Sequence, residues 1–263
     1  MNDSVRSKMP LVSVVVATYK QKNMILDTLN SIKNQTYANI ELVISDDCSP
    51  DDTVDVCRNW IGMNKHRFAR VELLCSEKNF GIVKNKNKCC FAAKGEWVKP
   101  IDGDDKLAPD CVEKYVNYVF TDRGVDMVFS PLEVFGDGDL QKWGKLCTSR
   151  LDKVLSMLER DFKMLLYKVT VFPAASLFIK RNFFMKMGGY DESIPDLEDW
   201  AFWSRCADAG CKFGFVNEKL VYYRISCSSL SQNLGGVITR GLWNRCDLQR
   251  KKTYSMQNVC HGC

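Results

Sequence analysis

Residues 11–19 read LVSVVVATY, a nearly unbroken apolar run in which the β-branched residue valine dominates. Such a run is typical of a β-strand that is buried on both faces of a sheet. The next segment, residues 23–35, carries apolar residues at helical spacing, and residues 40–47 read as a second strand that ends in two acids. A strand, a helix and a strand in this order predict a parallel βαβ unit.

The same alternation continues to about residue 110, which predicts an α/β fold with a Rossmann-like, mostly parallel central sheet flanked by helices. Ser49-Pro50-Asp51 is a helix start signal in which Ser49 is the expected N-cap. The further elements expected here are a helix over 49–61, a strand over 71–75, a helix over 81–95 ended by Gly95, and a strand over 96–101.

The second half of the chain has a more mixed pattern, which predicts a smaller mixed sheet. We expect one globular domain over 1–232, with a first half at about 1–105 and a second half at 106–232, followed by a basic amphipathic tail over 233–263. The expected elements are helices over 109–122, 181–189 and 196–210, and strands within 125–135, 174–180 and 213–226.

The composition is that of an ordinary globular protein, with 46% hydrophobic residues and a net charge of +5. The polar start MNDSVRSKMP does not resemble a signal peptide, so we expect the 13 cysteines to be reduced thiols in a cytoplasmic protein, soluble or peripheral. The basic residues are spread out and not gathered with aromatic residues, so nucleic-acid binding is not expected.

Acidic residues follow two of the predicted strands where each strand ends. Asp46 and Asp47 end the second strand, and the segment 102–105, which reads DGDD, follows the fourth. In parallel sheets ligands bind beyond the carboxyl ends of the strands, so these acids should meet at one edge. Carboxylates clustered at such an edge most often hold Mg²⁺ or Mn²⁺ on a phosphate group.

Other sites that use acids fit this sequence less well. An aspartyl-phosphate loop would follow the first strand and carry a hydroxyl residue, and an EF-hand loop would need a glutamate at its twelfth position. The histidines, His66 and His261, lie away from the predicted strand ends, which disfavours zinc. A nucleotidyl- or phosphoryl-transfer enzyme is a further alternative, although ATYKQKN after the first strand lacks the glycine of a phosphate loop.

Five ordered segments give the chain a family resemblance that extends over about residues 10–232. They are the segment from PLVSVVVATYK to ISDDCSPDDT (10–53), NFGIVKNKNK (79–88), KGEWVKPIDGDD (94–105), MGGYDE (187–192) and EDWAFWSR (198–205). In these segments the chain resembles the inverting family 2 glycosyltransferases with the GT-A fold, of the bacterial surface-polysaccharide type.

The resemblance implies transfer of a sugar from a nucleotide sugar, UDP-linked by preference, to a hydroxyl of a glycan or lipid-linked oligosaccharide. It places the nucleotide sugar in the half at about 1–105 and the acceptor in 106–232. It also implies a role in polysaccharide, O-antigen or capsule biosynthesis, with peripheral contact at the cytoplasmic face of the inner membrane. The amphipathic pattern of the basic tail is typical of a core-facing helix with a solvated basic face, and docking to an anionic membrane surface is the alternative function for this tail.

For the nucleotide sugar, the resemblance implies that Asp47 hydrogen-bonds the nucleotide base and that Ala17 and Tyr19 lie where the base is lined and stacked. Lys86 stands where relatives usually have arginine, near the base or the diphosphate. An ammonium group there lacks the planar fork of a guanidinium.

The same resemblance assigns the DGDD segment and the EDW segment. Asp102 and Asp104 form the DxD motif, in which Asp102 faces the ribose or sugar and Asp104 holds Mn²⁺ or Mg²⁺ on the diphosphate. The other implied roles are orientation of the sugar or the loop by Asp105, general-base catalysis by Asp199, and acceptor binding by Glu198 and Trp200.

The chain departs from the family pattern at two places. Ser226 stands where relatives often have a histidine after Tyr-Arg, and GIVKNKNK lacks the small residues common in that segment. If that histidine binds metal or diphosphate in relatives, this chain does so differently. A non-catalytic nucleotide-sugar-binding scaffold on the same fold is therefore the alternative function.

Overall fold

The computed structural model describes residues 9–137, 174–194 and 198–226. The chain divides into two compact units, one formed by 1–135 and 140–224, the other by 136–139 and 225–263. The predicted basic tail over 233–263 lies outside the described residues. The fold and the site below belong to the first unit, apart from the last residue of two strands.

Within the described residues, the central sheet has seven strands in the order β3-β2-β1-β4-β8-β6-β9. The first four strands run parallel, whereas β8 is antiparallel to both of its neighbours, and β9 is parallel to β6. The predicted mostly parallel sheet is thus confirmed. The strands are β1 (Val12–Thr18), β2 (Ile40–Asp46), β3 (Arg70–Cys75), β4 (Trp97–Asp102), β6 (Met127–Phe129), β8 (Phe178–Lys180) and β9 (Phe213–Phe215).

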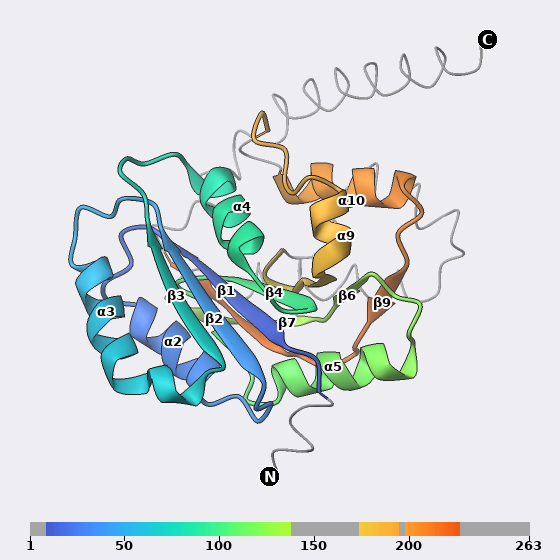
Figure 1. Cartoon of the computed structure of the whole chain (residues 1–263), viewed down its shortest axis with the longest axis horizontal. Coiled ribbons are helices and arrows are strands. Elements are labelled where there is room, and N and C mark those ends of the chain that lie inside the picture. Colours follow the sequence, from blue (N-terminus) through green and yellow to red (C-terminus); the bar gives the residue numbers. More distant parts are fainter. Residues whose placement is uncertain (1–8, 138–173, 195–197, 227–263) are drawn as a thin grey trace. The chain divides into compact units, whose positions relative to one another are not determined.

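Helices cover both faces of this sheet (Figure 1). Successive side chains of a strand point to opposite faces, so Val14 and Val16 of β1 join one core and Val15 joins the other. The first core packs against α2 (Ile25–Lys33), α3 (Thr53–Asn64) and α5 (Cys111–Thr121). The second packs against α4 (Ile82–Ala92), α9 (Arg181–Lys186) and α10 (Glu198–Asp208).

A second sheet of three strands confirms the smaller sheet that the mixed pattern predicts. Its order is β5-β10-β7, and β5 pairs antiparallel with β10. The strands are β5 (Lys106–Leu107), β7 (Leu132–Gly136) and β10 (Val221–Ile225), and short 3₁₀ turns occur at η1 (Lys65–Arg67) and η2 (Ala174–Ser176).

Two predicted helix boundaries are wrong. The helix α3 begins at Thr53 with Asp52 as its N-cap, because the amide and hydroxyl of Ser49 donate to the Asp46 carboxylate (2.8 and 2.5 Å). The helix α4 ends at Ala92, before Gly95. A Cβ at Gly95 would lie 2.6 Å from Ser13 Oγ, so this glycine is required by close packing against β1.

The register of the parallel strands brings the acidic strand ends together. Ala17 of β1 pairs with Asp102 of β4, and Thr18 pairs with Asp46 of β2. The ends of the three central strands therefore lie side by side, as the sequence predicts, and the candidate site begins there.

Candidate active site

The loop that carries the DxD motif is packed tightly against the end of β1. The Gly103 amide donates to the Ala17 carbonyl (3.0 Å), and the Asp105 amide closes a turn onto the Asp102 carbonyl (3.1 Å). A Cβ at Gly103 would lie 2.2 Å from Gln21 Oε1 and 3.0 Å from Thr18 Cβ, so a larger residue would have to displace the Gln21 side chain. The hydrogen bonds of this turn therefore fix the backbone that carries Asp102 and Asp104.

Asp105 and Arg224 anchor this loop from the side of β10. Asp105 is buried, and its Oδ1 accepts the Arg224 amide (2.8 Å). The Arg224 guanidinium donates from Nε to the Asp104 carbonyl (2.8 Å), pairs with Asp27 (2.8 Å) and lies 4.4 Å from the Phe135 ring centroid. Burial, followed by the charge of Asp104, raises the pKa of Asp105 well above its usual range. Asp105 therefore supports the loop from inside the protein.

Asp104 lies in an environment that disfavours its negative charge. Burial, followed by the charge of Asp102, raises the pKa of Asp104 to about 6. Like charges held close together favour the protonated form unless a cation is present. The pair formed by Asp102 and Asp104 is thus suited to a positively charged partner.

Lys86 of α4 connects the DxD motif to the start of α10. Its Nζ lies 3.4 Å from Asp102 Oδ2 and 3.3 Å from Glu198 Oε1, and its side chain is 12% exposed. Burial alone would lower the pKa of Lys86, but the charges of Asp102 and Glu198 raise it well above its usual value. One ammonium group therefore joins carboxylates from two segments that are nearly 100 residues apart in the sequence.

Asp199 occupies the first turn of α10 beside Glu198. Its Oδ1 accepts the Trp200 amide (2.6 Å), as expected for an acid at a helix N-terminus. Burial, followed by the charge of Glu198, raises the pKa of Asp199 to about 6. A carboxylate with a pKa near neutrality is well placed to accept a proton. Trp200, an expected acceptor contact, is buried, with 8% of its surface exposed.

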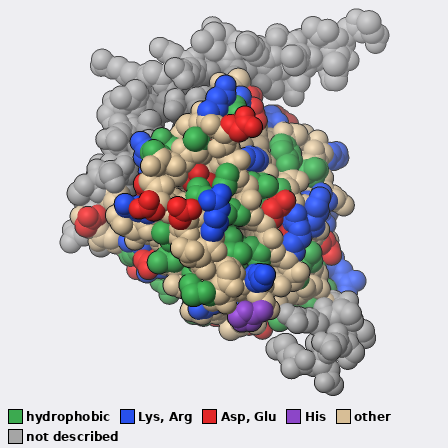
Figure 2. All heavy atoms as spheres, turned by 60° about the vertical axis from the view of Figure 1, so that its left-hand side comes forward, with side chains coloured by type: hydrophobic (Ala, Val, Ile, Leu, Met, Phe, Trp, Pro, Cys, Tyr) green, Lys and Arg blue, Asp and Glu red, His purple; other side chains and the backbone are tan. Residues whose placement is uncertain are grey.

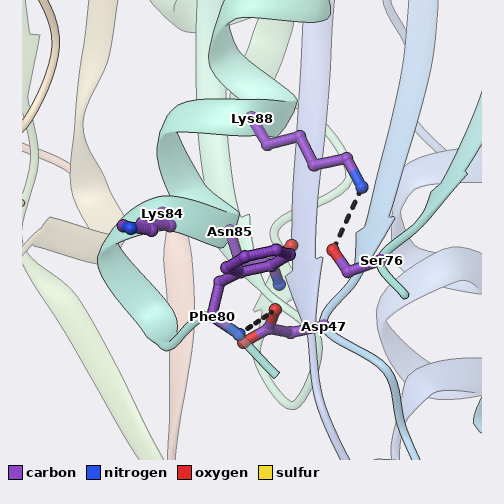
Figure 3. A pocket seen from close by; sticks show the side chains of 6 residues that line it. All are labelled: Asp47, Ser76, Phe80, Lys84, Asn85 and Lys88. Atoms are coloured by element: carbon purple, nitrogen blue, oxygen red, sulfur yellow. Dashed lines mark hydrogen bonds between the residues drawn. The ribbon is translucent and has the colours of Figure 1, made fainter. Parts of the chain in front are cut away.

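A cavity of about 270 Å³ lies beside the first turns of α4 (Figure 3). Asp47 forms part of its wall, and the Asp47 carboxylate accepts the amides of Phe80 (2.9 Å) and Gly81 (2.7 Å). Lys88 reaches across to the Ser76 hydroxyl (3.0 Å). The residues that line the cavity are Asp47, Ser76, Phe80, Lys84, Asn85 and Lys88.

Ala17 and Tyr19, the other residues expected to contact the nucleotide base, are not among the residues that line this cavity. Ala17 is buried in the core between β2 and β4, with 6% of its surface exposed. The Tyr19 ring is 37% exposed, and Lys20 Nζ lies 5.0 Å from its centroid. Their roles in base binding stay predictions.

Two features of the described residues limit how a metal ion could bind. No group of three His, Cys, Asp or Glu side chains there could hold an ion alone. Asp102 and Asp104 supply only carboxylate oxygens, which is the ligand type that Mg²⁺ and Mn²⁺ take, with the remaining ligands from water or phosphate. The pair therefore fits a hard cation that arrives with a diphosphate.

The structure adds residues that the sequence patterns did not single out. Arg224 was visible only as part of Tyr-Arg, and its contacts with the DxD loop cross more than 100 residues of sequence. Asn85 lines the cavity at a place where the family has small residues, and that departure was its only signal. Ser226 directly follows β10.

The surface carries both signs of charge. On the face shown in Figure 2, basic and acidic side chains are interspersed rather than separated into one patch of a single sign. Among the helices that the structure describes, none is long and apolar enough to cross a membrane.

Comparison with known proteins assigns this architecture. Residues 13–188 match the model of the family described as glycosyl transferase family 2. An uncharacterized glycosyltransferase MJ1057 of Methanocaldococcus jannaschii is 27% identical over 82% of this chain and 71% of that protein. The Escherichia coli UDP-Glc:alpha-D-GlcNAc-diphosphoundecaprenol beta-1,3-glucosyltransferase WfaP is 28% identical over 86% of this chain and 81% of its own length.

Solved structures show the same fold. S. aureus TarS 1–349 in complex with UDP-GlcNAc has a TM-score of 0.66 at 18% identity, over 83% of this chain and 60% of that one. The mannosyltransferase PcManGT of Pyrobaculum calidifontis, in complex with GDP-Man and Mn²⁺, has a TM-score of 0.64 at 20% identity, over 85% and 59%. The chain thus spans about three fifths of these solved chains.

Proposed function

The chain belongs to glycosyl transferase family 2 and is a glycosyltransferase, and we propose that it is an inverting enzyme that transfers a sugar from a UDP-sugar. The acceptor is a hydroxyl group of a glycan or of a lipid-linked oligosaccharide. The printed activity of WfaP, which combines a UDP-linked donor with a diphosphoundecaprenol-linked acceptor, supports both parts. Surface-polysaccharide assembly at the cytoplasmic face of the membrane is the corresponding setting.

The observation that carries this proposal is the ion-pair bridge through Lys86. It holds Asp102 of the donor-side loop and Glu198 of α10 within 3.4 Å of one ammonium group. Asp199 follows Glu198 directly. A donor diphosphate near Asp102 and an acceptor hydroxyl near Asp199 would therefore lie on either side of the Lys86 ammonium group.

Asp199 is the general base in this proposal. It removes the proton from the acceptor hydroxyl while the hydroxyl oxygen forms a bond to the anomeric carbon of the sugar. The bond between that carbon and the diphosphate oxygen breaks, and UDP leaves with the electron pair. Because attack and departure occur on opposite faces of the carbon, the anomeric configuration is inverted.

Asp102 and Asp104 would hold the divalent cation, Mn²⁺ or Mg²⁺, together with oxygens of the diphosphate. When bound, the cation stabilises the negative charge that develops on the leaving group. Asp105 and Arg224 keep the loop in position for this contact. Lys86 would add a positive charge near the diphosphate, and Glu198 and Trp200 would lie on the acceptor side.

The cavity beside α4 is the proposed site of the uracil base. Asp47 lines this cavity, and its carboxylate fixes the backbone at Phe80 and Gly81 by accepting their two amides. The cavity volume of about 270 Å³ is close to the lower end of the range of ligand sites. Ala17 and Tyr19 are proposed to line the base, as the resemblance implies.

The experiment is to measure UDP release from UDP-glucose and UDP-GlcNAc in the presence of Mn²⁺ and of a glycan or lipid-linked oligosaccharide acceptor. Asp199→Asn should reduce kcat by about 10²- to 10⁴-fold, the range for loss of a general base, with little change in the KM of the donor. Asp208→Asn, which alters an exposed acid at the other end of α10, is the matched control. Donor binding without turnover in the wild-type protein would instead support the scaffold alternative.

A further inference from the structure

The loop over residues 187–192, which reads MGGYDE, follows α9 and contacts both α4 and α10. Two consecutive glycines of this loop, Gly188 and Gly189, have left-handed backbone conformations (φ 73° each), which other residues rarely adopt. A Cβ at Gly189 would lie 2.6 Å from Asn87 Oδ1 and 2.7 Å from the Phe91 ring, both on α4. The loop therefore packs on α4 so closely that only glycine fits at the contact.

Asn87 holds this loop through both ends of its side-chain amide. Its Nδ2 donates to the Tyr190 carbonyl (2.9 Å), and its Oδ1 accepts the Tyr190 amide (2.8 Å). The same Nδ2 also donates to Glu192 Oε1 (3.2 Å). Asn87 is 3% exposed, so these bonds are shielded from water. A side chain that binds both the N–H and the C=O of one residue fixes the position and the direction of the backbone there.

The other side of the loop is bound to α10. Arg205 of this helix donates from Nη1 to the Met187 carbonyl (2.9 Å) and from Nη2 to the Gly189 carbonyl. The Tyr190 ring is buried, and its centroid lies 5.0 Å from that of Phe202, which also belongs to α10. The loop is thus an inflexible connection between α4 and the helix that begins with the proposed general base.

The start of α10 is close to both ends of this connection. Burial raises the pKa of Tyr190 well above its usual value, and the charges of Glu198 and Asp199 act in the same direction, as expected if the phenol lies near them. Lys86, which precedes Asn87 in α4, binds Glu198 directly (3.3 Å). Neighbouring residues of a helix point about 100° apart. Lys86 and Asn87 therefore hold α10 from two directions, one directly and one through the loop.

We infer that Asn87 is a positioning residue for the general base, because it holds the loop 187–192 against α4 and thereby fixes the start of α10 that carries Asp199. This inference rests on the proposed function, in which Asp199 accepts the proton of the acceptor hydroxyl. A misplacement of about 1 Å can cost about 10²-fold in rate. The cavity proposed for the base of the nucleotide is lined by other residues of α4 and not by Asn87. Loss of Asn87 should therefore affect the chemical step and not donor binding.

The test combines the kinetics of UDP release, with an acceptor present, and calorimetric titration with UDP. Asn87→Ala should lower kcat about 10- to 100-fold. The donor KM and the UDP affinity should stay within about threefold of the wild-type values, because the donor cavity is unchanged. The same substitution in the Asp199→Asn background should lower kcat by less than about threefold further, since an absent base cannot be misplaced. A general loss of packing would lower kcat by the same factor in both backgrounds.

Gln35→Ala is the matched control, because it also removes a buried side-chain amide that binds backbone through both of its ends. Gln35 is 5% exposed, donates to the Ala108 carbonyl (2.7 Å) and accepts the Val112 amide (3.0 Å). It lies between α2 and α5, which cover the opposite face of the sheet from α4. Both variants should lower the melting temperature, but Gln35→Ala should leave kcat within about twofold of the wild type.

The possible failures are distinguishable. An unchanged kcat in folded Asn87→Ala, or the same loss in both backgrounds, would overturn the inference and leave the proposed function intact. If Asn87→Ala does not fold, Arg205→Lys takes its place in the same cycle, because it keeps the charge and loses the fork that binds two carbonyls of the loop. A wild-type kcat in Asp199→Asn would overturn the proposed base, and the inference with it.

Discussion

Replacement of Lys86 by methionine removes the charge that joins Asp102 to Glu198 and keeps a side chain of similar length. The two contacts, at 3.4 and 3.3 Å, each correspond to a gross attraction of about 5 kcal/mol at an effective dielectric constant of about 20. Burial of the ammonium group offsets much of this, and loss of one partner of a buried pair typically costs about 3–5 kcal/mol. Since Asp102 is 28% exposed, we expect about 2–4 kcal/mol.

For a chain of this size, that loss corresponds to a decrease of roughly 5–15 °C in the melting temperature. UDP affinity should fall about tenfold, since a positive charge near the diphosphate is lost. Lys86→Arg should keep most of both properties because it retains the charge.

Scanning calorimetry and UDP titration on the same preparations measure both effects. Lys94→Met is the control, because Lys94 is exposed and lies two residues beyond the end of α4. If Lys86→Met melted within 1–2 °C of the wild type (about 0.5 kcal/mol) and bound UDP with unchanged affinity, the ion-pair bridge would have no energetic or functional role.

Three further predictions concern other groups of the site and its support. Burial raises the pKa of Asp199 to about 6, so the base is ionised only above that pH, and kcat/KM should fall about tenfold per pH unit below about 6 in a pH–rate profile. Arg224→Ala should raise the KM for a UDP-sugar or the Mn²⁺ concentration required about tenfold, because the DxD loop loses its contacts with the guanidinium group. The control is Arg58→Ala, which removes an exposed ion pair on α3 and should change neither quantity. Lys99 is fully buried, and burial lowers its pKa to about 8, so the folded protein favours the neutral amine. As the pH rises from 8 to 10.5, the free energy of unfolding of the wild type should therefore increase by about 3 kcal/mol relative to that of Lys99→Met. Urea unfolding of both proteins over this pH range measures the difference. A flat difference between those two proteins over that pH range would contradict the lowered pKa.

The alternating strands and helices of the first half were predictable because each element carries its own periodic pattern. The valine-rich run at 11–19 identified the central strand, and the acids at strand ends identified the edge of the sheet. Element boundaries were less predictable where side chains compete locally. Ser49 is a residue type that often caps helices, but here its amide and hydroxyl donate to the Asp46 carboxylate, and it does not cap α3.

The contacts that assemble the site depend on distance in space and not on local pattern. Lys86 meets Glu198 across 112 residues of sequence, and Arg224 meets the Asp104 carbonyl across 120. Burial of Lys99 inside β4 was also not predictable, because a lysine within an apolar strand reads as a solvent-facing position. Its Nζ instead donates to the carbonyls of Pro100 (2.7 Å) and Ala175 (2.5 Å).

We propose that the acids of the DGDD segment bind a cation on a nucleoside diphosphate. Calorimetric titration with UDP, with and without Mn²⁺, on the wild type, Asp104→Ala and the exposed control Asp122→Ala tests it most directly. UDP binding should depend on Mn²⁺ in the wild type and in Asp122→Ala, and this dependence should be lost in Asp104→Ala. UDP binding that is equally tight in all three proteins and independent of Mn²⁺ would contradict it.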